Sequence, residues 1–143
     1  MKKLFLTFLS ALQLAGIAAE DAKTGTAKTH RIVFEVVAEG KEAWDSVLNN
    51  VENARKALGA DATEVAVIAH GKGLGLLMKE SPVRERLEKI AGEKVVFAAC
   101  ENTMRKKNVA KDALLPVSTT VDSGVAEVVR KQEAGWSYIK SGG

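Results

Sequence analysis

Short apolar segments rich in Val, Ile and Phe alternate along this chain with segments whose apolar residues recur at helical spacing. The apolar segments predict strands over residues 30–38, 63–69, 94–99, 117–121 and 136–140. Because these segments are apolar on both faces, they indicate strands that helices cover on both sides. The pattern therefore predicts an α/β fold with three α/β/α layers and a mostly parallel five-stranded sheet.

The segments between the strands carry helix start and stop signals. In residues 41–58 the apolar side chains from Trp44 to Leu58 share one helical face, and Gly59 follows as a stop. The glycine-rich segment HGKGLG should open a short helical turn, GLLMK. Ser81 and Pro82 have the residue types of an N-cap and a first helical position, so we expect a helix to begin there.

Two further helices are expected in the C-terminal half. One is a short helix or helical turn over residues 101–107. The other begins after an N-cap at Asp122 or Ser123 and runs to residue 134, with Gly135 as its stop. We expect this last helix to turn three valines inward, namely Val125, Val128 and Val129.

The N-terminal segment MKKLFLTFLSALQLAGIAA has the pattern of a secretory signal peptide. A basic pair precedes a mostly apolar run that is too short and too polar for a comfortable transmembrane span. We expect residues 1–19 to be cleaved, residues 20–29 to be a disordered lead-in, and residues 30–143 to form a single domain. The mature protein would then be periplasmic or secreted, without a membrane anchor.

The charge of the chain argues against a polyanionic partner. The chain has 21 basic and 18 acidic side chains, a net charge of +3. Loss of Lys2 and Lys3 with the signal peptide leaves 19 basic side chains against the same 18 acidic ones. A chain this close to neutral has no strong field to attract nucleic acid or an anionic membrane, so we expect neither as a partner.

Cys100 is the only cysteine, so it cannot form an intramolecular disulfide. In an exported chain an odd thiol indicates a reactive group or intermolecular pairing, yet free cysteine is also among the most buried residue types. The only histidines are His30 and His70, and no Cys or His cluster has metal-ligand spacing. The glycines after His70 do not match a nucleotide-binding motif, so we expect neither metal nor cofactor.

Two predicted strands end at groups that can do chemistry. Cys100 follows the third strand, whereas His70 and Gly71 follow the second. Parallel strands present their carboxyl ends at one edge of a sheet, where ligands gather, so these groups should share one rim. This position favours a functional thiol. His70 can act there as a general base or can simply hydrogen-bond a neighbouring loop.

The residues after Cys100 bear on its ionisation, because the thiolate is the nucleophilic form. A helix start and the three cations at 105–107 favour an anion there, whereas Glu101 opposes it. Asn102 and Thr103 can donate hydrogen bonds to the sulfur or can cap the helix. The cations can equally form a solvated face. The candidate binding or supporting residues are His70, Gly71, Asn102, Thr103, Arg105 and Lys106.

Several segments resemble the DsrE/DsrF-like family of small α/β proteins linked to sulfur transfer. The resemblance spans about residues 30–140 and is carried by VAVIAHGKGLGLLM, VVFAACENTMRKKNV and LLPVSTTVDSGVAEVVRKQEAGWSYIK. The last two segments are most similar to the exported branch, in which ACxNTM and SGVAE…RKQEGWSYI-like segments recur.

This resemblance implies a flavodoxin-like layered fold and a homo-oligomer, commonly a trimer or a hexamer. In the sulfur-relay members a cysteine after the third strand carries a persulfide and passes its outer sulfur to a partner, and Cys100 occupies the corresponding place. Lys106 and Lys107 stand where those members have a basic pair. Asn108 replaces a glycine of that pattern, and residues 101–103 replace small apolar residues.

The sequence thus favours a sulfur carrier or sulfurtransferase-like protein that uses Cys100 as its catalytic residue and persulfide site. Its partners would be a protein that donates sulfur and one that accepts it. The alternative is a non-catalytic oligomeric module that binds a small molecule or an anion at the same rim. A third hypothesis is a redox-sensing thiol that forms an intermolecular disulfide.

Overall fold

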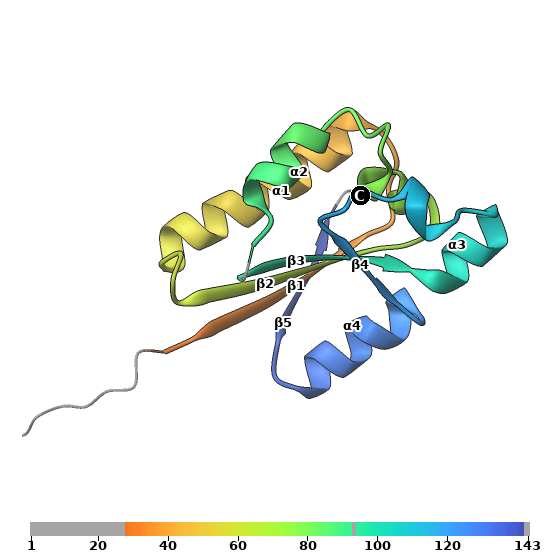
Figure 1. Ribbon diagram of the computed structural model, residues 1–143. Helices are drawn as coiled ribbons and strands as arrows, with labels where there is room; N and C mark the ends of the chain where they lie inside the picture. The colour runs from red at the N-terminus through yellow and green to blue at the C-terminus, as the bar shows by residue number, and fades with distance from the viewer. Residues whose placement is uncertain (1–27, 93, 142–143) are drawn as a thin grey trace, which may run out of the picture.

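The computed structural model describes residues 28–92 and 94–141 (Figure 1). The predicted signal peptide and most of the predicted lead-in lie outside the described residues. In chain order the elements are β1 (His30–Val36), α1 (Lys41–Leu58), β2 (Thr63–Ala69), the 3-10 helix η1 (Gly71–Leu77), α2 (Arg84–Ile90), β3 (Val95–Cys100), α3 (Glu101–Lys107), the 3-10 helix η2 (Lys111–Ala113), β4 (Ser118–Val121), α4 (Gly124–Glu133) and β5 (Ser137–Ser141).

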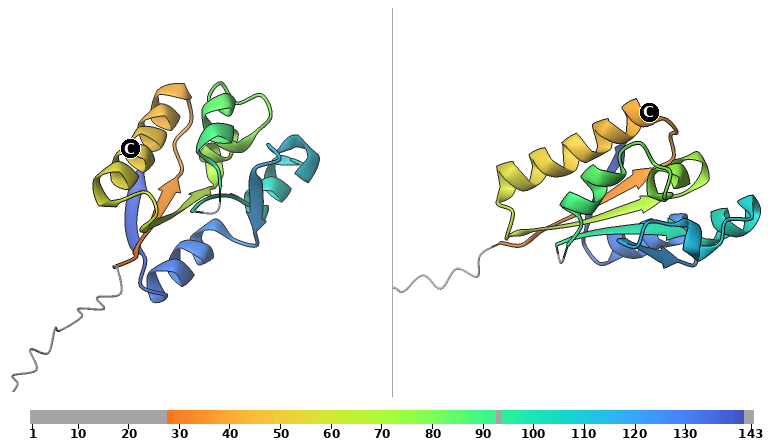
Figure 2. Two further views of the ribbon diagram at one scale, coloured as in Figure 1. Left: turned by 60° about the vertical axis from the view of Figure 1, so that its left-hand side comes forward. Right: turned by 45° about the horizontal axis from the view of Figure 1, so that its top comes forward.

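The strands form one five-stranded sheet in the order β4-β3-β2-β1-β5, and every neighbouring pair is parallel. The chain adds β2, β3 and β4 stepwise to one side of β1, then returns through α4 to place β5 on the other side. Because parallel crossovers are right-handed, outward steps and the return step put their helices on opposite faces. Figures 1 and 2 show this arrangement, with α1 and α2 on one face and α4 on the other. The predicted three-layer α/β fold is confirmed.

The two faces of the sheet carry cores of different size. The larger core lies under α1, η1 and α2, and includes Phe34 and Phe97, both fully buried. The smaller core, on the α4 face, is a cluster of Val33, Ala66, Ile68, Ala98 and Val128. The alternation of side chains along each strand explains the division, since Val33 and Phe34 are neighbours that point to opposite faces.

The α4 face is only partly covered, and here one expectation was wrong. Of the three valines expected to point inward, Val128 is 6% exposed but Val125 and Val129 are 57% and 46% exposed. Within residues 28–92 and 94–141, the ten-residue helix α4 is the one helix that packs on this face, and it meets the strands along a narrow stripe around Val128. Val96 of β3, on the same face as Ala98, is also 43% exposed.

The start of α2 also differs from the prediction. Ser81 and Pro82 lie in a turn closed by the Arg84 N–H, which donates to the Ser81 carbonyl at 3.1 Å. The helix begins only at Arg84, with Val83 at the N-cap and no side-chain cap. The Ser81 hydroxyl is buried and has no hydrogen-bond partner among the described residues. The side-chain types were right for a cap, but the chain uses them in the preceding turn.

The segment after β2 is a 3-10 helix rather than the expected short turn at GLLMK, and it begins at Gly71. Close contact with β1 explains the glycine at 73, because a Cβ there would lie 2.1 Å from the Val36 carbonyl oxygen. The cap of α4 is resolved in favour of Ser123, whose hydroxyl accepts a hydrogen bond from the Ala126 N–H at 3.4 Å. Gly135 follows α4 directly after its C-cap, as expected.

A candidate thiol site at the carboxyl edge of the sheet

Three neighbouring strands bring polar side chains to one edge of the sheet. Cys100 ends β3, His70 directly follows β2, and Glu35 is the last but one residue of β1. His70 keeps an extended backbone, with φ −146° and ψ 172°, so the alternation of the strand continues through it. The residues two positions earlier in each strand belong to the cluster under α4, so all three side chains lie on the α4 face: Val33, Ile68 and Ala98.

Cys100 is a covered thiol whose surroundings favour the thiolate. Only 4% of the residue is exposed, and it stands at the N-cap position of α3. Burial raises the pKa of the thiol, but hydrogen bonds from the Gly124 N–H, the Thr103 hydroxyl and the N–H groups of Thr103 and Asn102 lower it by more. The net pKa therefore lies below the usual 9.0. The donors belong to the first residues of α3 and α4, so two helix starts converge on one sulfur.

Thr103 connects the thiol to the end of β2. Its hydroxyl oxygen accepts a hydrogen bond from the Gly71 N–H at 3.0 Å. Because that N–H supplies a proton to the oxygen, the hydroxyl's own proton is free to donate to the Cys100 sulfur. Two residues proposed from the sequence, Gly71 and Thr103, thus act in series on the thiol.

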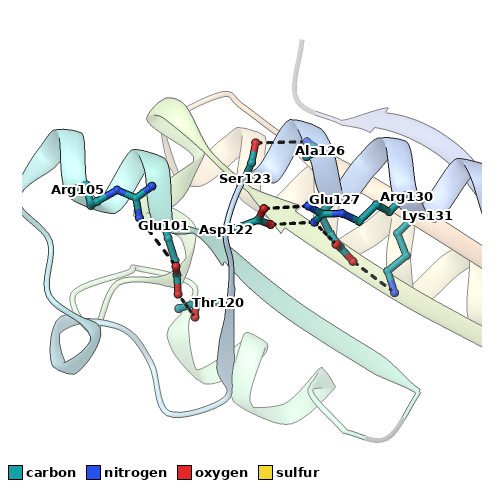
Figure 3. A network of polar contacts seen from close by, with 9 residues as sticks. All are labelled: Glu101, Arg105, Thr120, Asp122, Ser123, Ala126, Glu127, Arg130 and Lys131. Carbon is teal, nitrogen blue, oxygen red and sulfur yellow. Dashed lines mark hydrogen bonds and ion pairs between the residues drawn. The ribbon is translucent and has the colours of Figure 1, made fainter.

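The loop before α4 is fixed next to the thiol by backbone and side-chain contacts. The Asn102 N–H donates to the Asp122 carbonyl at 3.3 Å. The Asp122 carboxylate accepts two hydrogen bonds from Arg130, at 2.8 and 2.9 Å, as Figure 3 shows. This pairing with Arg130, with a smaller effect of the Ser123 N–H, lowers the pKa of Asp122 to about 2. The contacts hold the start of α4, and so the Gly124 N–H, beside Cys100.

His70 belongs to a hydrogen-bonded row that extends away from the thiol. Its Nε2 lies 2.8 Å from Oε1 of Glu35, and the Tyr138 hydroxyl of β5 donates to the other oxygen of that carboxylate. Burial raises the pKa of Glu35, but the Tyr138 and His70 contacts outweigh it, so the net pKa lies below its usual value. The hydrogen bond from the Tyr138 hydroxyl to Glu35 raises the pKa of Tyr138 to about 12. Both His70 and Glu35 side chains are 18% exposed.

The basic residues after Cys100 are not gathered around its sulfur. Arg105 donates to the side-chain oxygen of Asn102 and lies 3.9 Å from the Glu101 carboxylate. The Glu101 carboxylate also accepts from the Thr120 hydroxyl at 2.7 Å (Figure 3). Lys106 is exposed on α3. Of the candidate residues around the thiol, Asn102 therefore contributes through its backbone, while Arg105 and Lys106 form an outer, solvated part of the helix.

Three residues of this edge were not singled out from the sequence: Glu35, Gly124 and Tyr138. Glu35 lies inside an apolar strand, where a single acidic residue on one face is a weak signal. The contact of Glu35 with Tyr138 joins residues 103 positions apart and depends on β5 pairing with β1. The glycine at 124 is required by packing, because a Cβ there would lie 3.0 Å from the Cβ and Cδ2 atoms of His70.

The described part of the chain contains no group of three or more His, Cys, Asp or Glu side chains placed to hold a metal ion. The same residues form no helix that is long and apolar enough to cross a membrane. The groups present at this edge are a thiol, an imidazole, a carboxylate and a phenol.

Comparison with known proteins agrees with the fold. The model of the DsrE/DsrF-like family matches residues 30–141, which include every strand and helix described above. The chain belongs to the DsrE/DsrF-like family. This family is generally linked to sulfur relay, and its match covers Cys100, His70 and Glu35 alike.

Among solved structures, the chain is similar to MTH1491 from Methanobacterium thermoautotrophicum, described as a protein of unknown function. The two are 34% identical, with a TM-score of 0.66, and the match covers 78% of this chain and 98% of that one. A search of curated proteins found no match. The likeness supports the family fold and carries no activity of its own.

Proposed function

We propose that the protein is a sulfur carrier that binds sulfane sulfur as a persulfide on Cys100. The observation that carries the proposal is the convergence of the starts of α3 and α4 on the Cys100 sulfur, which lowers the pKa of the thiol despite its burial. A thiol used only for packing needs no such donors, whereas a nucleophilic thiol must ionise near neutral pH. Membership of a family linked to sulfur relay supports the same conclusion.

The chemistry requires no metal or electron carrier. The Cys100 thiolate attacks the outer sulfur of a donor persulfide or polysulfide, so that an S–S bond forms on Cys100 while the donor's S–S bond breaks. The donor leaves as a thiolate, and the outer sulfur has passed from one thiol to another. The N–H groups and the Thr103 hydroxyl that favour the thiolate would equally favour the persulfide anion, which also carries negative charge on sulfur.

This mechanism requires the sulfur donor to reach the Cys100 thiol. With 4% of Cys100 exposed, a donor reaches the sulfur only if a covering segment moves locally. We propose that the starts of α3 and α4 move, because they provide the N–H groups around the sulfur. The same low exposure favours the alternative function, a binding module in which Cys100 is a packing residue.

Sulfur loading separates the two functions. The purified protein is incubated with polysulfide, excess reagent is removed, and cyanide-labile sulfur is measured as thiocyanate. We expect about one labile sulfur per chain in the wild type and none in Cys100→Ser. Thr103→Val, which lacks one donor to the sulfur, should load more slowly. Equal background levels in all three proteins would leave the binding module as the better account.

We further propose that the protein is exported, on the strength of the signal-peptide pattern in residues 1–19. The mature protein would meet its sulfur donor and acceptor outside the cytoplasm. Expression of the full chain followed by cell fractionation and intact mass tests this proposal. A mass that begins near residue 20, found in the exported fraction, supports it; an uncleaved chain in the cytoplasm contradicts it.

A homo-oligomer, a trimer or a hexamer, is the third part of the proposal. Its support is the exposure of three valines on the α4 side of the sheet, Val96, Val125 and Val129, together with the family resemblance. Exposed apolar side chains that gather on one side of a monomer commonly mark a contact surface. Because the start of α4 also covers Cys100, an assembly built on this face would lie next to the thiol.

A further inference from the structure

Glu35, His70 and Tyr138 form a row of titratable groups at the carboxyl edge of the sheet that the sulfur-carrier proposal leaves without a role. The row crosses three strands, from β5 through β1 to the residue after β2. Glu35 is the centre: its carboxylate contacts the His70 ring through one oxygen and the Tyr138 hydroxyl through the other. A carboxylate with both oxygens engaged and 18% of its side chain exposed is held in one orientation.

His70 is the member of this row that lies next to the thiol. Ala69 pairs with Ala99, and the residues that follow them, His70 and Cys100, are therefore neighbours at the ends of strands about 4.8 Å apart. Gly124 contacts both residues. Its N–H interacts with the Cys100 sulfur, and its Cα packs so tightly on the imidazole that a Cβ would lie 3.0 Å from the His70 Cδ2.

The contact with Glu35 determines which imidazole nitrogen can take part in chemistry. A carboxylate only accepts hydrogen bonds, so the Nε2 atom that faces it must carry a proton. The neutral ring then has its unprotonated nitrogen at Nδ1. This is the arrangement in which a carboxylate orients a histidine as a base.

We propose that Glu35 is a positioning residue that acts through His70: it keeps Nε2 protonated, so that Nδ1 can accept the proton that Cys100 loses and return it to the departing donor thiolate. This inference rests on the proposed sulfur-carrier function. The proton balance closes, because the thiol proton moves to His70 and then to the leaving sulfur. The outer sulfur moves between two thiols, and no oxidant or reductant is consumed.

Other charges near the row are paired elsewhere or lie at its far end. Lys140 of β5 acts on Glu35 and also lowers the pKa of that carboxyl. At the starts of the two helices, Glu101 lies 3.4 Å from Lys111, and Asp122 is paired with Arg130. Lys72 pairs with Glu39 at 3.0 Å, in the open: their side chains are 69% and 63% exposed.

The test is the rate at which iodoacetamide alkylates Cys100, measured across pH in folded protein. The key variant is Glu35→Gln, which keeps the shape of the side chain but removes its charge. The matched control is Glu39→Gln, because Glu39 lies shortly after β1 and pairs with exposed Lys72 instead of His70. We expect Glu35→Gln to slow alkylation at pH 7 by about three- to tenfold, as a rise of up to one unit in the thiol pKa would produce. At pH 10 its rate should approach that of the wild type.

Repeating the Glu35→Gln substitution in a His70→Gln protein shows whether Glu35 acts through the histidine. In His70→Gln, alkylation at pH 7 should be slow, and adding Glu35→Gln should slow it no further. The proposal is overturned if the Glu35→Gln profile overlays that of the wild type or of Glu39→Gln, or if its effect persists undiminished without His70. A uniform loss at every pH would also overturn it, since that result indicates changed access.

Two controls show whether a changed alkylation rate comes from unfolding or from loss of the sulfur-carrier function. Circular dichroism checks that each variant is folded; if Glu35→Gln is not, His70→Gln alone must show the pH-dependent loss, and a wild-type profile there overturns the proposal. Alkylation reports the state of the thiol and needs no sulfur donor. Failure of the relay therefore leaves sulfur loading by Cys100 intact, whereas failure of the carrier function appears only in the loading assay.

Discussion

At the residue scale, the protein combines a thiol favoured as a thiolate with a phenol held neutral. Tyr138 donates to the Glu35 carboxylate, and this contact raises the pKa of Tyr138 to about 12 from the usual 10.0. The folded state therefore keeps the phenol protonated where the unfolded chain would ionise it. This contribution to stability is fully present below pH 10 and is lost as the pH rises toward about 12.

Tyr138 is the only tyrosine in the chain, so its ionisation can be followed directly by ultraviolet absorbance. In the folded wild type we expect a midpoint of about 12. Glu35→Gln should bring the midpoint back toward 10.0, because the neutral amide no longer opposes a phenolate. A wild-type midpoint at the ordinary value, in protein that circular dichroism shows to be folded, would contradict the Glu35 contact.

Thr103 gives the second residue-scale prediction. Thr103→Val keeps the shape of the side chain but removes both the acceptor for the Gly71 N–H and a donor to Cys100. We expect a higher thiol pKa, seen as slower alkylation at neutral pH, and a loss of about 1–2 kcal/mol in unfolding free energy. Thr103→Ser keeps the hydroxyl and should retain most of both. Equal behaviour of the two variants would mean that the hydroxyl is unimportant.

Some residues of the candidate site could be predicted from the sequence, and others could not. Cys100, Thr103 and Gly71 could be selected because strand ends of a parallel sheet meet at one edge, and that rule needs only the strand positions. Glu35 and Tyr138 could not be paired, since their contact depends on which strand lies beside β1. Nor could the sequence show that Arg105 turns to Asn102, because an exposed cation has many equivalent partners.

At the element scale, the start of α4 is the segment that links the thiol to the rest of the edge. Gly124 is tightly packed on His70 and its N–H interacts with Cys100. A helix start could be predicted where a side chain accepts a hydrogen bond from a free N–H of the first turn, as Ser123 does. The start of α2 could not be predicted in this way, because Ser81 and Pro82 lie in the turn before the helix and do not cap it.

Gly124→Ala tests this packing. Alanine favours a helix, yet its methyl group would lie about 3.0 Å from two atoms of His70, so α4 must shift. We expect a net destabilisation of about 1–3 kcal/mol in unfolding free energy, with slower Cys100 alkylation at neutral pH as the Gly124 N–H withdraws. Gly92→Ala, where an added Cβ meets nothing within 4 Å, is the matched control. A stabilised Gly124→Ala protein would contradict the close contact.

At the scale of the whole molecule, the topology explains why one face is poorly covered. Three strands are added in one direction with α1 and α2 on one face, and in the described part of the chain α4 is the helix that crosses the other face. The alternation of strands and helices predicted the layers, but not this strand order. The order decides that Val125 and Val129 lie beside the covered stripe rather than in it, which is why their predicted burial was wrong.

Val129→Lys is the test of self-association through this face. If the exposed valines form the contact between subunits, a charge there should convert the trimer or hexamer to monomers in size-exclusion chromatography with light scattering. Gln132→Lys adds the same charge at another exposed position of α4 and should leave the assembly intact. A wild type that is already monomeric, or a Val129→Lys variant that stays assembled, would place the contact elsewhere.

The proposed sulfur carrier requires the Cys100 sulfur to accept the outer sulfur of a donor. Its most direct test is to load the native protein with polysulfide, digest it, and weigh the peptide that contains Cys100 before and after dithiothreitol. We expect a gain of one sulfur atom on that peptide alone, removed by the reductant. A native protein that gains nothing, and whose thiol reacts with iodoacetamide only after unfolding, would make Cys100 a packing residue and contradict the account.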